Sequence, residues 1–281
     1  MDYLTGIVLG ILQGLSEFLP ISSTAHLTIA GTWMGLISPD HPERWTAFIA
    51  VIQLGTLAAV LIYFLRDVLE IITAFVSENI ASRVKFSNQT FHSRLGWYVL
   101  VGSLPIGILG ILLKKVIEGH LTKSLTVIAS SLIVLAVILA IAEFTGSFTK
   151  SLKRISFSDA LLVGFAQCLA LIPGSSRSGT TITAGIFLGM KREDAARFSF
   201  LLSMPAVFAS GLLEFKESLH YMGSQDLLVL LVSTVAALVS GYAAIGLLLR
   251  YLRTHSTFVF VFYRIILGAV LLWFGVFHKA M

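Results

Sequence analysis

Long apolar runs alternate with short polar segments along most of this chain. Six of the runs predict membrane-spanning helices, because a helix needs about 20 predominantly apolar residues to cross a bilayer. These runs cover residues 46–65, 95–113, 121–144, 195–213, 227–249 and 258–277. The polar connection Arg66–Arg94 follows the first run and contains a predicted surface helix near Val68–Val76.

Two other apolar stretches are each interrupted by a proline and several hydroxyl residues. The first covers residues 4–37 and is broken at Pro20, and the second covers residues 160–190 and is broken at Pro173. Because the resulting pieces are poor spans, we predict two helix pairs that each enter and leave the membrane on one side. Irregular backbone at membrane depth is tolerated only where protein buries it or water reaches it. Each turn therefore predicts a functional site.

The two interrupted stretches share a short pattern. Residues 13–23 contain Gln, an apolar stretch and then Pro-x-Ser-Ser, and residues 167–176 contain the same order. Each half then supplies one helix pair and three spans, and an odd number of crossings inserts the second half from the opposite side. We therefore predict an all-α polytopic membrane protein with a single transmembrane domain, residues 1–281. It is expected to be an inverted repeat of two halves, about 1–150 and 151–281, each with one re-entrant helix pair plus three transmembrane helices.

Composition excludes a soluble domain. The chain has 281 residues, of which 56% are hydrophobic and 12% charged, and its mean hydropathy is +0.89, values typical of integral membrane proteins. The single cysteine, Cys168, excludes an internal disulfide and a cysteine-based metal cluster. The basic residues that give the net charge of +5 are scattered through short loops. Membrane topology therefore explains them better than binding to nucleic acid does.

The loop charges predict the orientation. One face carries twelve basic residues: Arg66, Arg83, Lys85, Arg94, Lys150, Lys153, Arg154, Lys191, Arg192, Arg197, Arg250 and Arg253. The other face carries six: Arg44, Lys114, Lys115, Lys123, Lys216 and Lys279. Basic residues favour the cytoplasmic side, so both termini are expected outside the cell.

The second turn places a charged residue among hydroxyls inside apolar sequence. Arg177 lies in the segment 173–182, between Gly174 and Gly179. A charge at membrane depth is costly and usually pairs with a partner or binds a ligand. Unpaired N–H groups at a helix start, together with an arginine, make a seat for an anion such as phosphate. The alternative is a polar helix cap whose arginine extends to the membrane surface.

The first turn carries a carboxylate, hydroxyls and an imidazole. Gln13 and Glu17 are four residues apart and share a helix face. Ser22 and Ser23 follow the break, where they can cap the next helix, and His26 lies three residues later. These groups are expected to converge opposite the arginine of the second turn. Alternatively, Glu17 is a structural partner of that arginine, the serines are caps and the histidine is an interior residue.

At these residues the chain resembles the undecaprenyl-diphosphate phosphatases of the bacitracin-resistance type. Residues 13–26 match the signature Glu/Gln-x-x-x-Glu-Phe-Leu-Pro-x-Ser-Ser-Thr-x-His, and residues 173–179 match Pro-Gly-x-Ser-Arg-Ser-Gly. Further similarity covers 51–55, 199–205 and Tyr263-Arg264. Many members have glutamate where this chain has glutamine at the first position of the signature, so a site with two carboxylates is not expected here.

The resemblance implies a hydrolase that converts undecaprenyl diphosphate to the monophosphate carrier of cell-wall precursors. It implies a multi-pass protein of the bacterial inner membrane whose site opens to the outer face; it leaves a homodimer open and implies no nucleic acid. The implied catalytic residues are Ser23 as nucleophile, His26 as its base or proton shuttle, Glu17 as acid/base group or cation ligand, and Arg177 as phosphate clamp. Further implied substrate contacts are Ser22, Thr24, Ser176, Ser178 and Thr181. The implied cofactor is Mg²⁺ or Ca²⁺, with Glu17 and Gln13 as its candidate ligands.

Two other activities fit parts of the pattern. Inverted repeats are common in transporters, so the chain could move a polyprenyl phosphate across the membrane. The residues Ser23-Thr-Ala-His26 also resemble a motif of phosphatidic-acid phosphatases. That family's Lys-x₆-Arg-Pro signature is absent from this sequence, which makes it the weaker alternative.

Overall fold

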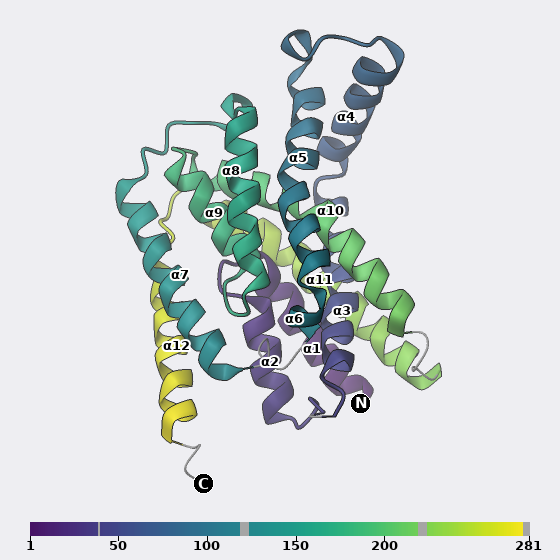
Figure 1. Cartoon of the computed structure of the whole chain (residues 1–281), viewed down its shortest axis with the longest axis vertical. Coiled ribbons are helices and arrows are strands. Elements are labelled where there is room, and N and C mark those ends of the chain that lie inside the picture. The colour runs from purple at the N-terminus through teal and green to yellow at the C-terminus, as the bar shows by residue number, and fades with distance from the viewer. Residues whose placement is uncertain (39, 119–123, 219–223, 278–281) are drawn as a thin grey trace.

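The computed structural model describes residues 1–38, 40–118, 124–218 and 224–277, and these ranges are helical almost throughout (Figure 1). The helices are α1 Tyr3–Phe18, α2 Ser23–Trp33, α3 Pro42–Tyr63, α4 Leu65–Val76, α5 Phe91–Leu112, α6 Lys114–Glu118, α7 Leu125–Thr145, α8 Phe157–Gln167, α9 Arg177–Phe187, α10 Arg192–Ser218, α11 Ser224–Leu252 and α12 Phe258–Phe277. Within the described ranges there is no strand, only an isolated bridge between Lys150 and Met190. The all-α prediction is confirmed.

Five helices are long and apolar enough to cross a membrane. They are Glu43–Tyr63, Phe91–Leu112, Leu125–Thr145, Arg192–Lys216 and Asp226–Leu252. The sixth predicted span is the apolar helix α12, which falls with Tyr3–Phe18 and Phe157–Leu171 among the shorter apolar helices. The chain is thus a multi-pass membrane protein.

Some helices begin earlier than predicted, and in one case a side-chain cap explains the difference. Helix α5 begins at Phe91, four residues before the predicted run, because the Thr90 hydroxyl accepts a hydrogen bond from the Ser93 N–H. Such a cap satisfies a backbone donor that the helix itself leaves unpaired. The predicted surface helix is α4, which begins three residues earlier than expected. The first residues of the predicted run 121–144, with Lys123, and also Lys279, lie outside the described residues.

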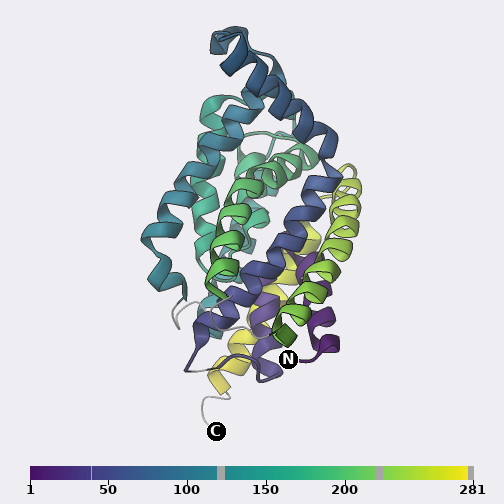
Figure 2. The same cartoon turned by 90° about the vertical axis from the view of Figure 1, so that its right-hand side faces the viewer.

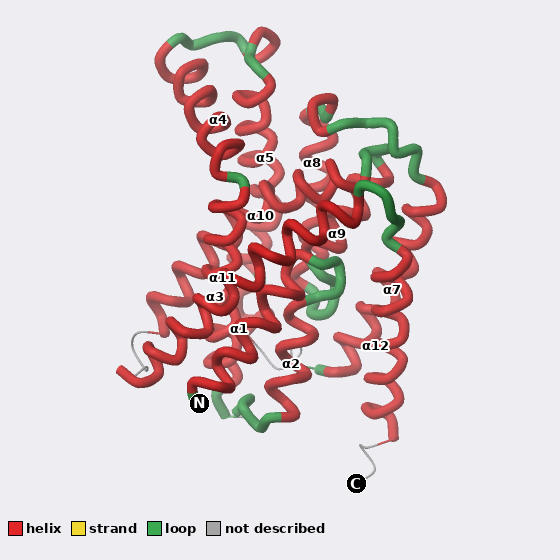
Figure 3. Tube along the Cα trace, turned by 180° about the vertical axis from the view of Figure 1, so that it is seen from behind, coloured by secondary structure: helices red, strands yellow, loops and turns green. Residues whose placement is uncertain are grey.

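The first turn of α1 and the last turn of α12 lie at the same end of the molecule (Figure 2). The connection between α4 and α5 and the connection between α7 and α8 lie at the opposite end (Figures 1 and 3). Those two connections carry several residues of the larger predicted basic set, among them Arg83, Lys85 and Lys153.

Small residues hold α1 close to α11. Gly6, Gly10 and Gly14 repeat at every fourth position of α1, and a side-chain carbon at Gly10 would overlap the carbonyl of Ser233, while one at Gly14 would overlap the Ser240 hydroxyl. Small residues let membrane helices approach closely and gain van der Waals contact. This packing fixes the helix that carries the first polar turn.

The second polar turn is held against α7. Gly174 has a φ of +88°, and a side chain there would overlap the Ile128 carbonyl and the Ser131 hydroxyl. The same hydroxyl donates a hydrogen bond to the Pro173 carbonyl. Only glycine combines this backbone conformation with so close an approach.

An ion pair joins α7, α10 and the start of α12 at the end opposite the termini. Arg192 donates to Glu143 through Nε at 2.7 Å, and the Thr257 hydroxyl donates to the other oxygen of the same carboxylate at 2.8 Å. The guanidinium also lies 3.7 Å from the centre of the Phe148 ring. Helix α12, which packs along α7, is therefore anchored where it begins.

Candidate active site

The two interrupted helices follow one register. Helix α8 begins 154 residues after α1, at Phe157 against Tyr3, and α9 begins 154 residues after α2, at Arg177 against Ser23. Helices α2 and α9 also have the same length of 11 residues. In this register Gln167 stands at the position of Gln13.

A serine with a positive φ caps each second helix. Ser22 has a φ of 74° and accepts a hydrogen bond from the Ala25 N–H, and Ser176 has a φ of 66° and accepts one from the Gly179 N–H. Non-glycine residues rarely adopt this conformation, and they concentrate at functional sites. The first residues of the two helices are therefore equivalent, and they are Ser23 and Arg177.

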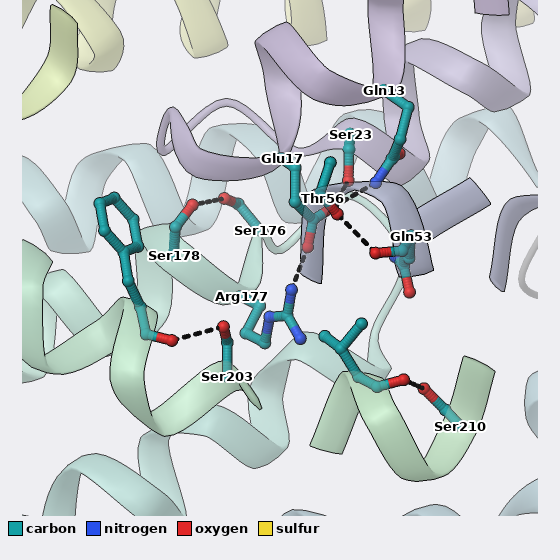
Figure 4. A network of polar contacts seen from close by, with 12 residues as sticks. Gln13, Glu17, Ser23, Gln53, Thr56, Ser176, Arg177, Ser178, Ser203 and Ser210 are labelled. Atoms are coloured by element: carbon teal, nitrogen blue, oxygen red, sulfur yellow. Dashed lines mark hydrogen bonds and ion pairs between the residues drawn. The ribbon is translucent and has the colours of Figure 1, made fainter. Parts of the chain in front are cut away.

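The Glu17 carboxylate joins these two residues (Figure 4). One of its oxygens is ion-paired with Arg177, and the other accepts hydrogen bonds from the Ser23 hydroxyl at 2.6 Å and from Gln13 Nε2 at 2.9 Å. The Glu17 side chain is 4% exposed and that of Arg177 17%. The expected convergence of the carboxylate, Ser23 and the arginine is thus present, and Glu17 is the ionic partner of Arg177 within the protein.

His26 lies at the same turn but faces another residue. Its Nδ1 is 2.7 Å from the Ser22 carbonyl, which can only accept, so Nδ1 carries the proton and Nε2 accepts from the Tyr263 hydroxyl at 2.5 Å. The two rings are stacked with their centres 5.6 Å apart. Among the hydrogen bonds of the described residues none joins His26 to Ser23, and the group bonded to the Ser23 hydroxyl is Glu17.

The remaining predicted substrate contacts are hydroxyls in or near the turns. Ser176 and Ser178 are 3.2 Å apart, and Ser178 donates to the Leu19 carbonyl of the first turn at 3.0 Å. Thr181 donates to the Arg177 carbonyl at 2.7 Å. These hydroxyls therefore already stabilise the turns. Thr24, the second residue of α2, is half-buried.

Helix α12 adds two residues that the sequence did not single out as site residues. Tyr263 contacts the histidine of the first turn. Arg264 is fully buried and donates to carbonyls of both turns. Both lie in the run 258–277, whose sequence predicts an ordinary apolar span. The signals for them were the family resemblance at Tyr263-Arg264 and the presence of an arginine within an apolar run.

The oxygen donors at the first turn fit a divalent cation that takes its other ligands from substrate and water. The described residues contain no group of three or more His, Cys, Asp or Glu side chains able to hold a metal ion. Glu17 supplies one carboxylate, and Gln13 Oε1 is buried without a hydrogen-bond partner. Mg²⁺ commonly uses one or two carboxylates together with substrate phosphates and waters.

The fold and the site define a multi-pass helical membrane protein with a hydroxyl, a carboxylate and an arginine where two interrupted helices meet. Comparison with known proteins agrees. The family model described as "Bacitracin resistance protein BacA" matches residues 6–270, and the chain belongs to this family.

Three relatives named undecaprenyl-diphosphatase align with nearly the whole chain. The protein from Syntrophobacter fumaroxidans is 65% identical over 273 residues, which cover 97% of this chain and 97% of that protein. The protein from Myxococcus xanthus is 52% identical over 272 residues, covering 97% and 89%, and that from Chloroherpeton thalassium is 52% identical over 281 residues, covering 97% and 96%.

Proposed function

We propose that this protein is an integral-membrane phosphatase that hydrolyses undecaprenyl diphosphate to undecaprenyl phosphate and phosphate. This activity recycles the lipid carrier for peptidoglycan synthesis. The names of the relatives support the substrate. The observation that carries the chemistry is the Ser23 hydroxyl bonded to Glu17, whose second oxygen pairs with Arg177.

Ser23 is the proposed nucleophile. Its hydroxyl already donates to Glu17 at 2.6 Å, so the carboxylate is placed to take the proton as the oxygen attacks the terminal phosphorus. The bond from this phosphorus to the bridging oxygen would break, and undecaprenyl phosphate would leave. A nucleophile and a base within hydrogen-bond reach, with a third group orienting the base, is the usual arrangement of covalent catalysis. Gln13 and Arg177 orient the carboxylate here. Water would then attack the phosphoserine and break its bond from phosphorus to the serine oxygen, which releases phosphate, while the proton held by Glu17 returns to the serine oxygen.

Arg177 is the proposed phosphate clamp. It is the first residue of α9, so its guanidinium and the unpaired N–H groups of that helix start can face one anion. Phosphoryl transfer depends mainly on positioning and on neutralising charge spread over the phosphate oxygens. The guanidinium is also paired with Glu17, and the incoming phosphate would share it with this carboxylate.

His26 is proposed to move protons between the site and Tyr263. Its Nε2 accepts from the tyrosine hydroxyl, and the fixed Nδ1 proton holds the ring in one tautomer. A divalent cation, Mg²⁺ or Ca²⁺, bound through Glu17 and Gln13 would neutralise charge on the diphosphate oxygens.

The fold is proposed to be an inverted repeat, with both interrupted helix pairs re-entrant and the site near the membrane midplane. The common register of the two halves and the short lengths of α1 and α8 support this arrangement. A lipid with a membrane-soluble tail and a charged head can reach such a site from the bilayer. We propose the inner membrane as its location, with the site open to the outer face.

The purified protein in detergent is expected to release phosphate from undecaprenyl diphosphate and to stop when divalent cations are chelated. In detergent no membrane separates two compartments, so a transporter without hydrolytic activity would release no phosphate. Phosphate can be measured colorimetrically, with Mg²⁺ or Ca²⁺ added back after chelation. Full activity in excess chelator would remove the cation from the mechanism.

A reporter fused after Thr149 is expected to be cytoplasmic, and one fused at the C-terminus is expected to be external. The basic residues near Thr149 favour the cytoplasmic side, and the end of α12 lies at the other end of the molecule (Figure 1). Paired phosphatase and fluorescent-protein reporters would test both positions. Two fusions on one side would contradict the inverted repeat.

Arg177→Lys is expected to lose nearly as much turnover as Arg177→Ala, about 10²-fold or more. Guanidinium is a planar fork that holds two phosphate oxygens, whereas an ammonium is a compact, strongly hydrated point charge. Arg192→Lys is a matched control, because Arg192 is also ion-paired with a buried glutamate but lies away from the turns. Near-normal turnover of the first variant would exclude the clamp.

A further inference from the structure

Arg264 is the largest fully buried side chain of the described residues, with no exposed surface. A buried charge is strongly unfavourable unless it is paired and hydrogen-bonded. Yet the ion pairs of the described residues do not include Arg264, and its Nε has no hydrogen-bond partner. Packing alone does not explain an arginine at this position of α12.

The guanidinium bonds to the backbone of both polar turns. Nη1 donates to the Pro20 carbonyl at 3.3 Å, and Nη2 donates to the carbonyls of Gly174 at 3.4 Å and Ser175 at 3.0 Å. Pro20 and Gly174 are equivalent in the 154-residue register of the two halves. One side chain from a third segment therefore joins matching points of the two turns.

Gly179, the third residue of α9, leaves room for the Arg264 guanidinium. A side-chain carbon at Gly179 would lie 2.7 Å from Arg264 Nη1, closer than nonbonded atoms can approach. The guanidinium is buried and held by three hydrogen bonds, so it cannot move aside freely. The glycine that ends the segment Pro173–Gly179 is thus explained by its contact with α12.

We propose that Arg264 is a positioning residue of the active site: it holds the two turns together so that Ser23 and Arg177 meet at Glu17. The proposal rests on the phosphatase function proposed above. Arg264 bonds to the residues just before α2 and α9, and the first residues of these helices are the nucleophile and the clamp. A displacement of one turn by about 1 Å is enough to lower turnover about 10²-fold.

The test compares Arg264→Lys with Gly179→Ala in purified protein. Lysine keeps the charge but has one donor group, which cannot span both turns. The Gly179→Ala variant keeps Arg264, but its added methyl group overlaps the guanidinium and displaces it. Each change is expected to lower kcat for undecaprenyl diphosphate about 10²-fold with KM unchanged, and the double variant should lose no more than the more damaged single variant. Gly107→Ala is the matched control, since a side chain at Gly107 meets nothing within 4 Å.

A second readout is independent of hydrolysis. Spin labels at Leu15→Cys and Ile172→Cys, both exposed and each close to one turn, are placed in a Cys168→Ser background. The distance between the labels is expected to lengthen or broaden in both variants. If wild-type protein released no phosphate, the proposed function would fail while this measurement still decided the role of Arg264.

Normal kcat in Arg264→Lys, or an unchanged label distance in both variants, would overturn the proposal. If Arg264→Lys failed to fold, Gly179→Ala would decide alone. Normal turnover in that variant would show that displacement of the guanidinium does not matter, and the proposal would again be overturned.

Discussion

Purified Ser23→Ala protein is expected to release phosphate about 10³- to 10⁴-fold more slowly than the wild type, with little change in KM. Among the described residues, the hydrogen-bond partner of the Ser23 hydroxyl is Glu17, and the proposed attack of this hydroxyl on phosphorus occurs only in the transition state. Alanine is well accommodated at the first position of a helix, and losing one hydrogen bond costs about 1 kcal/mol of stability. The measurement is kcat and KM for undecaprenyl diphosphate in detergent.

Two companion variants define what the Ser23 result means. Ser16→Ala removes another buried hydroxyl on the preceding helix, one that donates to the Leu12 carbonyl of its own helix, and it should keep normal turnover. His26→Ala should lose less turnover than Ser23→Ala, because Glu17 contacts the nucleophile and His26 does not. Equal losses would make the histidine the base instead. A loss confined to KM would reduce Ser23 to a binding residue.

Glu17→Gln is expected to lower turnover by about 10³-fold or more and also to destabilise the protein. The change keeps the shape of the side chain but removes the base, the proposed cation ligand and the partner of Arg177. Leaving an arginine without its buried partner typically costs about 3–5 kcal/mol of folding stability. The cost is expected to be smaller here because Arg177 is partly exposed. Turnover and thermal unfolding in detergent should be measured together.

The double variant Glu17→Gln/Arg177→Gln separates these two effects. Removing both charges avoids an unpaired buried arginine, so part of the lost stability should return. Activity should stay at the level of the single variant, because neither the base nor the clamp is present. Recovery of activity along with stability would mean that the pair is structural.

Much of the helical layout follows from local sequence. Apolar runs of the required length predicted every long helix, and the breaks at Pro20 and near Pro173 are where the structure interrupts its helices. The alignment of the two halves was less accurate. Sequence matched Pro20 with Pro173, whereas the capping serines place Pro20 opposite Gly174. A positive φ at a serine decides that register, and residue type alone does not reveal it.

Part of the site was also accessible from spacing. Gln13 and Glu17, four residues apart on a helix, are hydrogen-bonded as helical geometry predicts. The partner of Ser23 depends on how the chain reverses after α1, which spacing does not determine. Arg264 lies 244 residues from Pro20 in the chain. No periodic pattern links positions so far apart, and they are brought together by tertiary packing, in which α12 lies along α7 and contacts α2.

The equivalence of Ser23 and Arg177 has a consequence for stoichiometry. Matching positions of the two halves hold the proposed nucleophile, Ser23, in one half and the proposed anion-binding group, Arg177, in the other, so the two halves have different proposed roles. The residue equivalent to Glu17 in the second half is Leu171, whose side chain can neither accept nor donate a proton. If the proposed roles of Ser23 and Arg177 hold, the two halves would form the complementary sides of one catalytic centre, and each polypeptide would process one lipid head group at a time.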